Sequence, residues 1–253
     1  PDPKDFFPED PNLVIDLSKY GPLAEKFKMW LVSSADAVAT DNNKVKKWYD
    51  WSGNQNHAIQ TNSDNQPVIT FDNINGLPSI GFNKDESDHM ITHPYNTTGN
   101  LAIFMVFKTG DTISGRTYYH TDTGSSIAIK PAEAGFDAWN YSSQTGVSKG
   151  SLSVGKLKPN TTYVGAYRYT ENGIASIALN GGITDKTTDT TNTITQTGNQ
   201  AKIIGAHPNI TDFWNGEIAE ILVVSGEVDN MFYYGLQRYL GNKWGLNDYM
   251  DSD

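Results

Sequence analysis

Two uninterrupted apolar runs set the strongest limit on the fold of this chain. Residues 101–107 and 218–224 are apolar at nearly every position. They are too short to cross a membrane as helices, and they are typical of strands that are covered on both faces. Around them stand shorter alternating runs, rich in β-branched and aromatic residues and separated by Gly, Asn, Asp and Thr. The pattern predicts an all-β protein in which these two runs are central strands.

The shorter runs give the remaining strands. They are predicted at residues 29–33, 45–49, 78–82, 127–130, 136–141, 163–170, 174–179 and 202–205. The pair 163–170 and 174–179 flanks Asn172-Gly173, which supplies the positive φ of a hairpin turn. Residues 182–198 are rich in Thr, Asp and Asn, so we expect an irregular loop or a weak edge strand there.

Helical periodicity is found only near the C-terminus. Apolar residues recur there every four positions, at Phe232, Leu236, Leu240 and Trp244. Asp229 is the expected N-cap, and the helix should end near Gly245. We therefore predict one amphipathic helix that packs its apolar stripe on the strands.

The length and composition favour one domain. A chain of 253 residues is within the size of a single large β domain, so residues 13–253 are predicted to fold as one unit. Residues 1–12 contain four prolines and are predicted to be an extended arm or linker of a longer polypeptide. The absence of cysteine excludes disulfides, thiolate metal sites and a catalytic thiol.

The charge balance argues against nucleic acid as a partner. The chain has 19 Lys and Arg against 29 Asp and Glu, a net charge of −10, and no dense basic run that could follow a phosphate backbone. The longest basic cluster, Lys44 with Lys46 and Lys47, is interpreted as the solvated face of a strand.

Three stretches resemble concanavalin A-like and laminin-G-like jelly-roll domains. Trp30-Leu31, Ala35-Asp36-Ala37 and residues 48–58 resemble the opening of such a domain. Residues 76–83 stand where these domains place a strand that leads into an acidic loop, and residues 213–223 with 239–246 look like their final strand and helix. The resemblance covers residues 29–246. It implies a two-sheet antiparallel jelly-roll sandwich with one C-terminal amphipathic helix.

The resemblance also implies a setting and a class of partner. Related domains are carbohydrate-binding lectins and adhesion modules of bacterial surface proteins and phage structural proteins. The expected partner is therefore a surface glycan or polysaccharide, and the expected location is extracellular, on a cell surface or on a virion. A decoration or docking domain that binds other structural proteins and no sugar is the alternative. Membrane insertion is not expected.

Catalysis is the disfavoured alternative. Glycoside hydrolases with this fold carry carboxylates at alternate positions of one strand, so that all of them face one groove. Here the strand offers Glu217 and Glu220, whose spacing of three predicts opposite faces unless a bulge intervenes. A jelly-roll lyase would need clustered Tyr, His, Gln and Arg side chains, and no Gln-Ile-His run is present. We expect no enzyme and no catalytic residues.

Two polar residues are assigned structural roles. Glu220 shares a face with Ile218 and Leu222, which predicts a buried carboxylate that needs hydrogen bonds or a cation. His57 is predicted to be a loop histidine that satisfies backbone groups rather than a metal ligand. The five histidines are dispersed along the sequence, so a zinc site is not predicted.

Sugar binding would use aromatic faces beside amide groups that orient the hydroxyls. The candidate ligand-binding residues with this chemistry are Trp139, Asn140, Tyr141, Trp214, Asn215, Tyr118 and Tyr119. By contrast, Trp30, Trp48 and Trp244 are assigned to the core from their place in the pattern.

A calcium ion is the one cofactor that the sequence suggests. The acidic loop at residues 83–88 offers several hard oxygens on one turn, which calcium prefers. Its candidate ligands are Asn83, Asp85 and Asp88. The loop lacks the spacing of an EF-hand.

Overall fold

The computed structural model describes residues 24–34, 37–97, 100–121, 125–132, 135–142, 148–170, 174–187 and 199–246. The predicted arm at residues 1–12 and the turn at 171–173 lie outside the described residues. The strands are β1 Phe27–Val32, β2 Val38–Asp41, β3 Lys44–Trp48, β4 Ala58–Ile59, β5 Val68–Ile74, β6 Leu77–Phe82, β7 Met90–Thr92, β8 Leu101–Thr109, β9 Tyr118–Thr121, β10 Ser125–Ala132, β11 Gly135–Ser142, β12 Ser148–Val154, β13 Thr162–Tyr169, β14 Ile174–Leu179, β15 Gly182–Thr187, β16 Ile203–Ile204 and β17 Gly216–Ser225. The helices are α1 Asn230–Lys243 and the 3₁₀ turns η4 Ser63–Asn65 and η5 Lys84–Glu86.

The all-β prediction is confirmed. All ten predicted strands form, and each strand pair in the described residues is antiparallel. The strands β2, β4, β5, β7, β9 and β12 were not predicted, and β15 was expected as either a loop or a weak edge strand. Most of them are short or polar and carry no clear alternation, so only their pairing partners make them strands.

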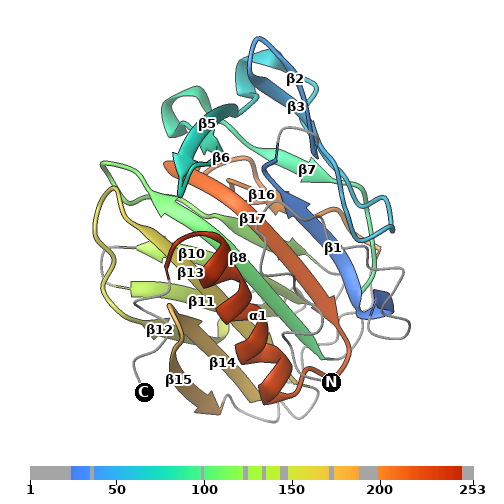
Figure 1. Cartoon of the computed structure of the whole chain (residues 1–253). Coiled ribbons are helices and arrows are strands. Elements are labelled where there is room, and N and C mark those ends of the chain that lie inside the picture. The colour runs from blue at the N-terminus through green and yellow to red at the C-terminus, as the bar shows by residue number, and fades with distance from the viewer. Residues whose placement is uncertain are drawn as a thin grey trace.

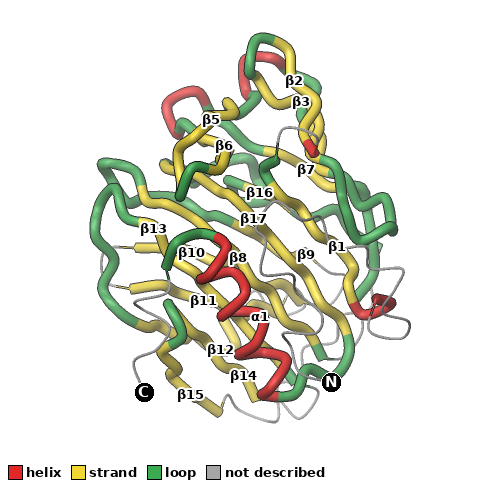
Figure 2. The backbone as a smooth tube through the Cα atoms, viewed as in Figure 1, coloured by secondary structure: helices red, strands yellow, loops and turns green. Residues whose placement is uncertain are grey.

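The strands form one hydrogen-bonded network with two long ladders. The first ladder runs β6–β17–β8–β13–β14–β15, with β1 also paired to β17. The second ladder runs β2–β3–β4–β7–β16–β9–β10–β11–β12. A single pair, Lys44 with Val68, connects β3 of the second ladder to β5, which pairs with β6 of the first. In Figures 1 and 2, α1 crosses in front of β8 and β13.

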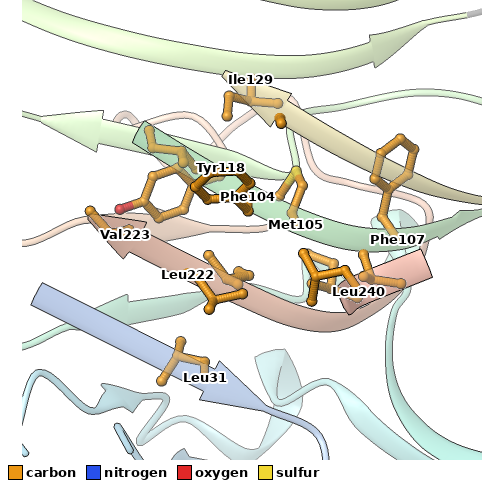
Figure 3. Close-up of a cluster of buried hydrophobic side chains, with 14 of the residues drawn as sticks. Leu31, Phe104, Met105, Phe107, Tyr118, Ile129, Leu222, Val223 and Leu240 are labelled. Atoms are coloured by element: carbon orange, nitrogen blue, oxygen red, sulfur yellow. The ribbon is translucent and has the colours of Figure 1, made fainter. Parts of the chain in front are cut away.

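The main core lies between the two ladders. Met105 and Val223 of the first ladder and Tyr118 and Ile129 of the second are fully buried members of one cluster (Figure 3). On its other side β8 is covered by α1, where the ring of Phe104 contacts that of Tyr233 at a centroid distance of 5.4 Å. This double coverage explains why residues 101–107 are apolar without alternation.

The C-terminal helix forms as predicted. The Asp229 carboxylate accepts a hydrogen bond of 2.7 Å from the Phe232 N–H and so caps the first turn. Leu236, Leu240 and Trp244 are buried. The stripe that the sequence predicts is therefore the face that packs on the strands.

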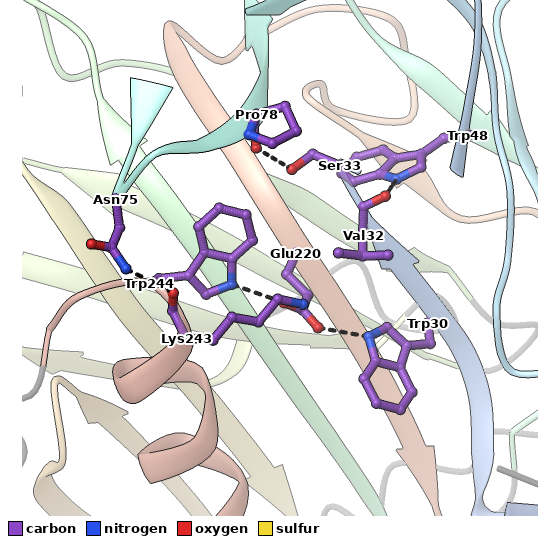
Figure 4. A network of polar contacts seen from close by, with 9 residues as sticks. All are labelled: Trp30, Val32, Ser33, Trp48, Asn75, Pro78, Glu220, Lys243 and Trp244. Carbon is purple, nitrogen blue, oxygen red and sulfur yellow. Dashed lines mark hydrogen bonds and ion pairs between the residues drawn. The ribbon is translucent and has the colours of Figure 1, made fainter. Parts of the chain in front are cut away.

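Glu220 is the buried polar centre between α1 and the first ladder (Figure 4). Its side chain is 0% exposed. One carboxylate oxygen accepts from Trp30 Nε1 at 2.7 Å, and the other accepts from Trp244 Nε1 at 2.8 Å and lies 2.8 Å from Lys243 Nζ. The predicted burial of this carboxylate, and its need for hydrogen bonds or a cation, are confirmed.

The bulge that the sequence left open does lie between Glu217 and Glu220, so the expectation of opposite faces is wrong. The bulge, at Ala219, shifts the register, so that Glu217 pairs with Lys108 and Glu220 with Val106. Those two partners are two residues apart on β8, which puts both carboxylates on one face. Although the two carboxylates share a face, they do not form an acid and base pair. Glu220 is buried under the helix, and both of its carboxylate oxygens accept hydrogen bonds from the protein.

Candidate ligand-binding face

The outward side of the second ladder carries a row of aligned residues. Cross-strand pairing aligns Ile59, Ile91, Ile203, Tyr119 and Ala128 on β4, β7, β16, β9 and β10. Their chain neighbours Met90 and Ile204 belong to the main core, so the row lies on the opposite side of the ladder. We call this side the outer face.

Four of the five histidines belong to the outer face: His57, His89, His93 and His207. The first three stand two residues from a member of the row, and strand alternation places them on its side. His207 packs edge-to-face on Tyr119 at a centroid distance of 5.3 Å. The fifth, His120, is fully buried, and burial lowers its pKa well below the usual value.

At one end of the face, three rings and one cation form a group that we call the Tyr49 cluster. It consists of Lys47, Tyr49, His57 and His93. The ring centroids of Tyr49 and His57 are 5.4 Å apart, and those of His57 and His93 are 5.6 Å apart. Lys47 Nζ lies 4.7 Å from the centroid of the Tyr49 ring. Tyr49 is 37% exposed, so the cluster is accessible from solvent.

Asp50 fixes the loop that carries His57. One carboxylate oxygen accepts from the Trp30 N–H at 2.8 Å and the Ser52 N–H at 2.9 Å. The other accepts from Ser52 Oγ and the Asn56 N–H, each at 2.8 Å. The Asn56 side chain in turn donates to the Lys28 carbonyl of β1 at 2.6 Å. The loop is therefore held to β1 before any ligand arrives.

The hydrogen bonds of the two cluster histidines determine their tautomers. His57 Nδ1 accepts the Asp50 N–H at 2.9 Å, so the ring is neutral with its proton on Nε2. Burial, with the positive charge of Lys47, lowers the pKa of His57. His93 Nδ1 lies 2.9 Å from the Gln55 carbonyl oxygen and must donate to it. In neutral His93 the Nε2 is therefore an acceptor, so the two rings together carry one donor nitrogen and one acceptor nitrogen that no described residue binds.

A second ring cluster lies further along the face. The ring of Tyr119, 8% exposed, is packed with His207 and near Phe213. Arg116 Nε lies 2.9 Å from an Asp212 carboxylate oxygen, whereas Arg116 Nη1 is buried without a partner. At His89 both ring nitrogens already have protein partners. This region is more closed than the Tyr49 cluster.

Comparison with known proteins gives similarity of fold. No family model matches the chain, and no curated protein sequence matches it. Domain 4 of AbnA, a GH43 extracellular arabinanase from Geobacillus stearothermophilus, in complex with arabinotriose, is similar to it with a TM-score of 0.58 and 14% identity. The match covers 89% of this chain and 98% of that domain.

Two further solved structures are similar over half of their own length. The botulinum neurotoxin serotype D ligand binding domain, in complex with N-acetylneuraminic acid, has a TM-score of 0.58 and 9% identity over 90% of this chain and 55% of that one. An arabinofuranosidase complexed with arabinofuranosyl-alpha-1,2-xylobiose has a TM-score of 0.54 and 14% identity over 79% and 51%. At these identities the likeness shows the fold alone.

Trp214 is not the exposed platform that the sequence predicted. Its indole is 0% exposed and packs edge-to-face on Phe107 at 6.0 Å, because the segment leading into β17 turns its apolar side chain into the core. The Asn215 side chain donates to Asp111 Oδ1 and to the Thr112 carbonyl, each at 3.0 Å. It ties two loops together rather than facing a ligand.

The other predicted sugar-binding residues lie in different parts of the fold. Tyr118 points into the core, where its hydroxyl lies 3.0 Å from that of Tyr95, so it offers no platform. Tyr119 does lie on the outer face. Trp139, Asn140 and Tyr141 belong to β11, where Trp139 pairs with Ala128 of the outer-face row, and their side chains lie outside the described residues. Trp30, Trp48 and Trp244 are buried, as predicted.

The predicted calcium ligands hold their own loop together. Asn83 Oδ1 accepts the Asp85 N–H at 3.0 Å, and an Asp88 oxygen accepts the Asn83 N–H at 2.8 Å. The second oxygen of Asp88 is buried without a partner, and burial raises the pKa of this carboxyl to about 6. In the part of the chain that the structure describes, no three His, Asp or Glu side chains gather as a metal site. Calcium stays a prediction.

Sequence reasoning missed the Tyr49 cluster as a site. The prediction that His57 satisfies a backbone group is confirmed by its bond to the Asp50 N–H. The pairing of β4 with β7 then brings His93 to its side. No spacing of residues in the sequence predicts that pairing.

The described residues include no helix long and apolar enough to cross a membrane.

Proposed function

We propose that this chain is a non-catalytic glycan-binding module of a surface or phage tail-fibre protein, built as a jelly-roll sandwich. The Tyr49 cluster is its sugar site. The observation that carries the proposal is an accessible tyrosine ring beside two histidines that offer a donor and an acceptor.

The chemistry of the cluster matches that of a sugar ring. The apolar C–H side of a sugar packs on the exposed part of the Tyr49 ring. A hydroxyl group both donates and accepts, so neighbouring hydroxyls accept from His57 Nε2–H and donate to His93 Nε2. Because Asp50 already holds the loop, little ordering entropy opposes binding.

The solved structures similar in fold support sugar binding. One was solved with arabinotriose and one with N-acetylneuraminic acid. The buried and occupied Glu220 adds no support for a hydrolase.

A glycan microarray followed by titration calorimetry tests the proposal. Arabinotriose, lactose and 3′-sialyllactose are the first soluble probes. We expect Tyr49→Ala to weaken binding of the best probe by about tenfold or more, the effect of losing a central aromatic contact. Its melting temperature should stay close to that of the parent chain.

Tyr234→Ala is the matched control, because Tyr234 is 40% exposed on α1, away from the outer face. It should leave affinity unchanged. Equal effects of the two substitutions, or no glycan bound on the array, would reject the proposal. Self-association without glycan binding, measured by sedimentation, would favour the docking alternative.

A further inference from the structure

We infer that the sugar bound by the Tyr49 cluster is acidic, and that Lys47 receives its carboxylate or sulfate group. This inference rests on the proposed function and names the ligand class of the same site.

Lys47 is a cation that forms no ion pair in the part of the chain that the structure describes. Within the described residues, ion pairs join Arg116, Lys130 and Lys243 to carboxylates, and none involves Lys47. Asp50, the acidic residue nearest in sequence, uses both carboxylate oxygens to accept hydrogen bonds from its own loop and from β1. Among the described residues, no carboxylate therefore pairs with Lys47, in a chain whose net charge is −10.

The position of this charge ties it to the ring site. Lys47 Nζ lies over the Tyr49 ring at 4.7 Å, and burial, together with the positive charge of Lys47, lowers the pKa of His57. Of the groups that act on His57, Lys47 and His93 disfavour its protonation and Asp50 favours it. The ammonium group of Lys47 thus stands beside the ring on which the sugar packs.

A sugar that packs on Tyr49 brings its substituents within reach of the ammonium group. A carboxylate or sulfate there would form a charge-assisted hydrogen bond with Lys47. A neutral sugar would keep the ring and histidine contacts and leave the ammonium to water. Lys47 should accordingly decide selectivity between acidic and neutral sugars more than it decides basal affinity.

Paired probes measure that selectivity. Trigalacturonate is compared with its neutral methyl ester, and 3′-sialyllactose with lactose, by titration calorimetry at low and moderate salt. We expect the parent chain to prefer the acidic member of the better-bound pair by about three- to tenfold. The preference should shrink as salt screens the charges.

Lys47→Met should abolish the preference for the acidic member of the pair, because it removes the ammonium group that the carboxylate or sulfate would contact. Lys46→Met is the control. Lys46 directly precedes Lys47 on β3, is exposed, and contacts no aromatic ring among the described residues. This substitution removes the same net charge and should keep the preference. If the two substitutions act alike, general charge rather than Lys47 is responsible and the inference fails.

The remaining outcomes separate this inference from the proposed function. If acidic and neutral probes bind equally well but Tyr49→Ala weakens both, the glycan site stands and the acidic specificity is rejected. If no probe binds, or if Tyr49→Ala changes neither member of a bound pair, the site itself is rejected and the inference falls with it.

Discussion

The Glu220 centre and the Tyr49 cluster are both polar groups set among aromatic rings, yet their hydrogen bonding differs. Both oxygens of Glu220 receive donors, two indole N–H groups and an ammonium group, and the side chain is fully buried. In the Tyr49 cluster the inner nitrogens of both histidines are bonded. Within the described residues, their Nε2 atoms have no hydrogen-bond partner and Lys47 forms no ion pair.

The difference separates stability from binding. A buried polar network whose members are all satisfied fixes one packing arrangement and has nothing left for a ligand. In the Tyr49 cluster only one nitrogen of each histidine is bonded to the protein. Those bonds fix the geometry of the rings, and the other nitrogen of each ring can still bond to a ligand. The predictions below test this contrast, in order of their effect on the free energy of unfolding.

The largest effect is expected from Glu220→Ala. Removing the carboxylate leaves the Lys243 ammonium and two indole N–H groups buried without an acceptor, which should lower the free energy of unfolding by about 3–5 kcal/mol. Urea unfolding followed by tryptophan fluorescence measures it. Trp244→Phe, which removes one donor and keeps most of the ring volume, should cost less. A loss below about 1 kcal/mol for Glu220→Ala would mean that the network is not a stability element.

The hydrogen bonding of Asp88 is intermediate between that of the Glu220 centre and that of the Tyr49 cluster. One of its carboxylate oxygens accepts a hydrogen bond, and the other is buried without a partner. Burial raises the pKa of this carboxyl from 3.8 to about 6, so the folded chain binds its proton more tightly than the unfolded chain does. The resulting stabilisation is fully present below pH 3.8 and is lost as the pH rises through about 6.

Asp88→Asn removes the buried charge and should raise the free energy of unfolding at pH 8 by about 1–3 kcal/mol. It should also flatten the decline between about pH 4 and 6. Urea unfolding at a series of pH values tests both effects. Asp85→Asn, an exposed change in the same loop, is the control. A destabilising effect of Asp88→Asn at pH 8 would show that the ionised carboxylate has a partner, such as a cation.

The smallest effect on stability belongs to the cluster histidines. Nitrogen-15 NMR should find the proton of His57 on Nε2 and that of His93 on Nδ1. Because the pKa of His57 is lowered in the folded chain, the unfolded chain takes up the proton more readily. The small contribution of His57 to stability is therefore lost as the pH falls below 6.5. His57→Ala frees the Asp50 N–H and should cost about 0.5–1.5 kcal/mol. Finding Nδ1–H at His57 would remove the donor on which the site depends.

Several parts of the fold could be predicted because their signals are local. The continuous apolar run at 101–107 requires cover on both faces, and the structure supplies it with α1 and the second ladder. A cap at Asp229 and a four-residue period define the helix. The burial of Glu220 followed from its apolar neighbours on β17.

The wrong predictions concern features that depend on another strand. The bulge at Ala219 exists only relative to β8, so alternation along one strand could not show that Glu217 and Glu220 share a face. Trp214 was taken for a surface platform from its asparagine neighbour. Its burial against Phe107 depends on how the preceding loop turns.

The sequence by itself determined the antiparallel β class, the central strands, the helix and the satisfied, buried character of Glu220, because burial and periodicity act between residues close together in the chain. Tertiary structure alone decided which polar groups remain unsatisfied at the surface. Tyr49 lies beside His57 because β3 pairs with β4, and His93 joins them because β4 pairs with β7. The free ring nitrogens of the two histidines follow from bonds to backbone atoms that only the folded loop presents. Strand pairing joins residues that are distant in sequence, and no local pattern encodes the partner.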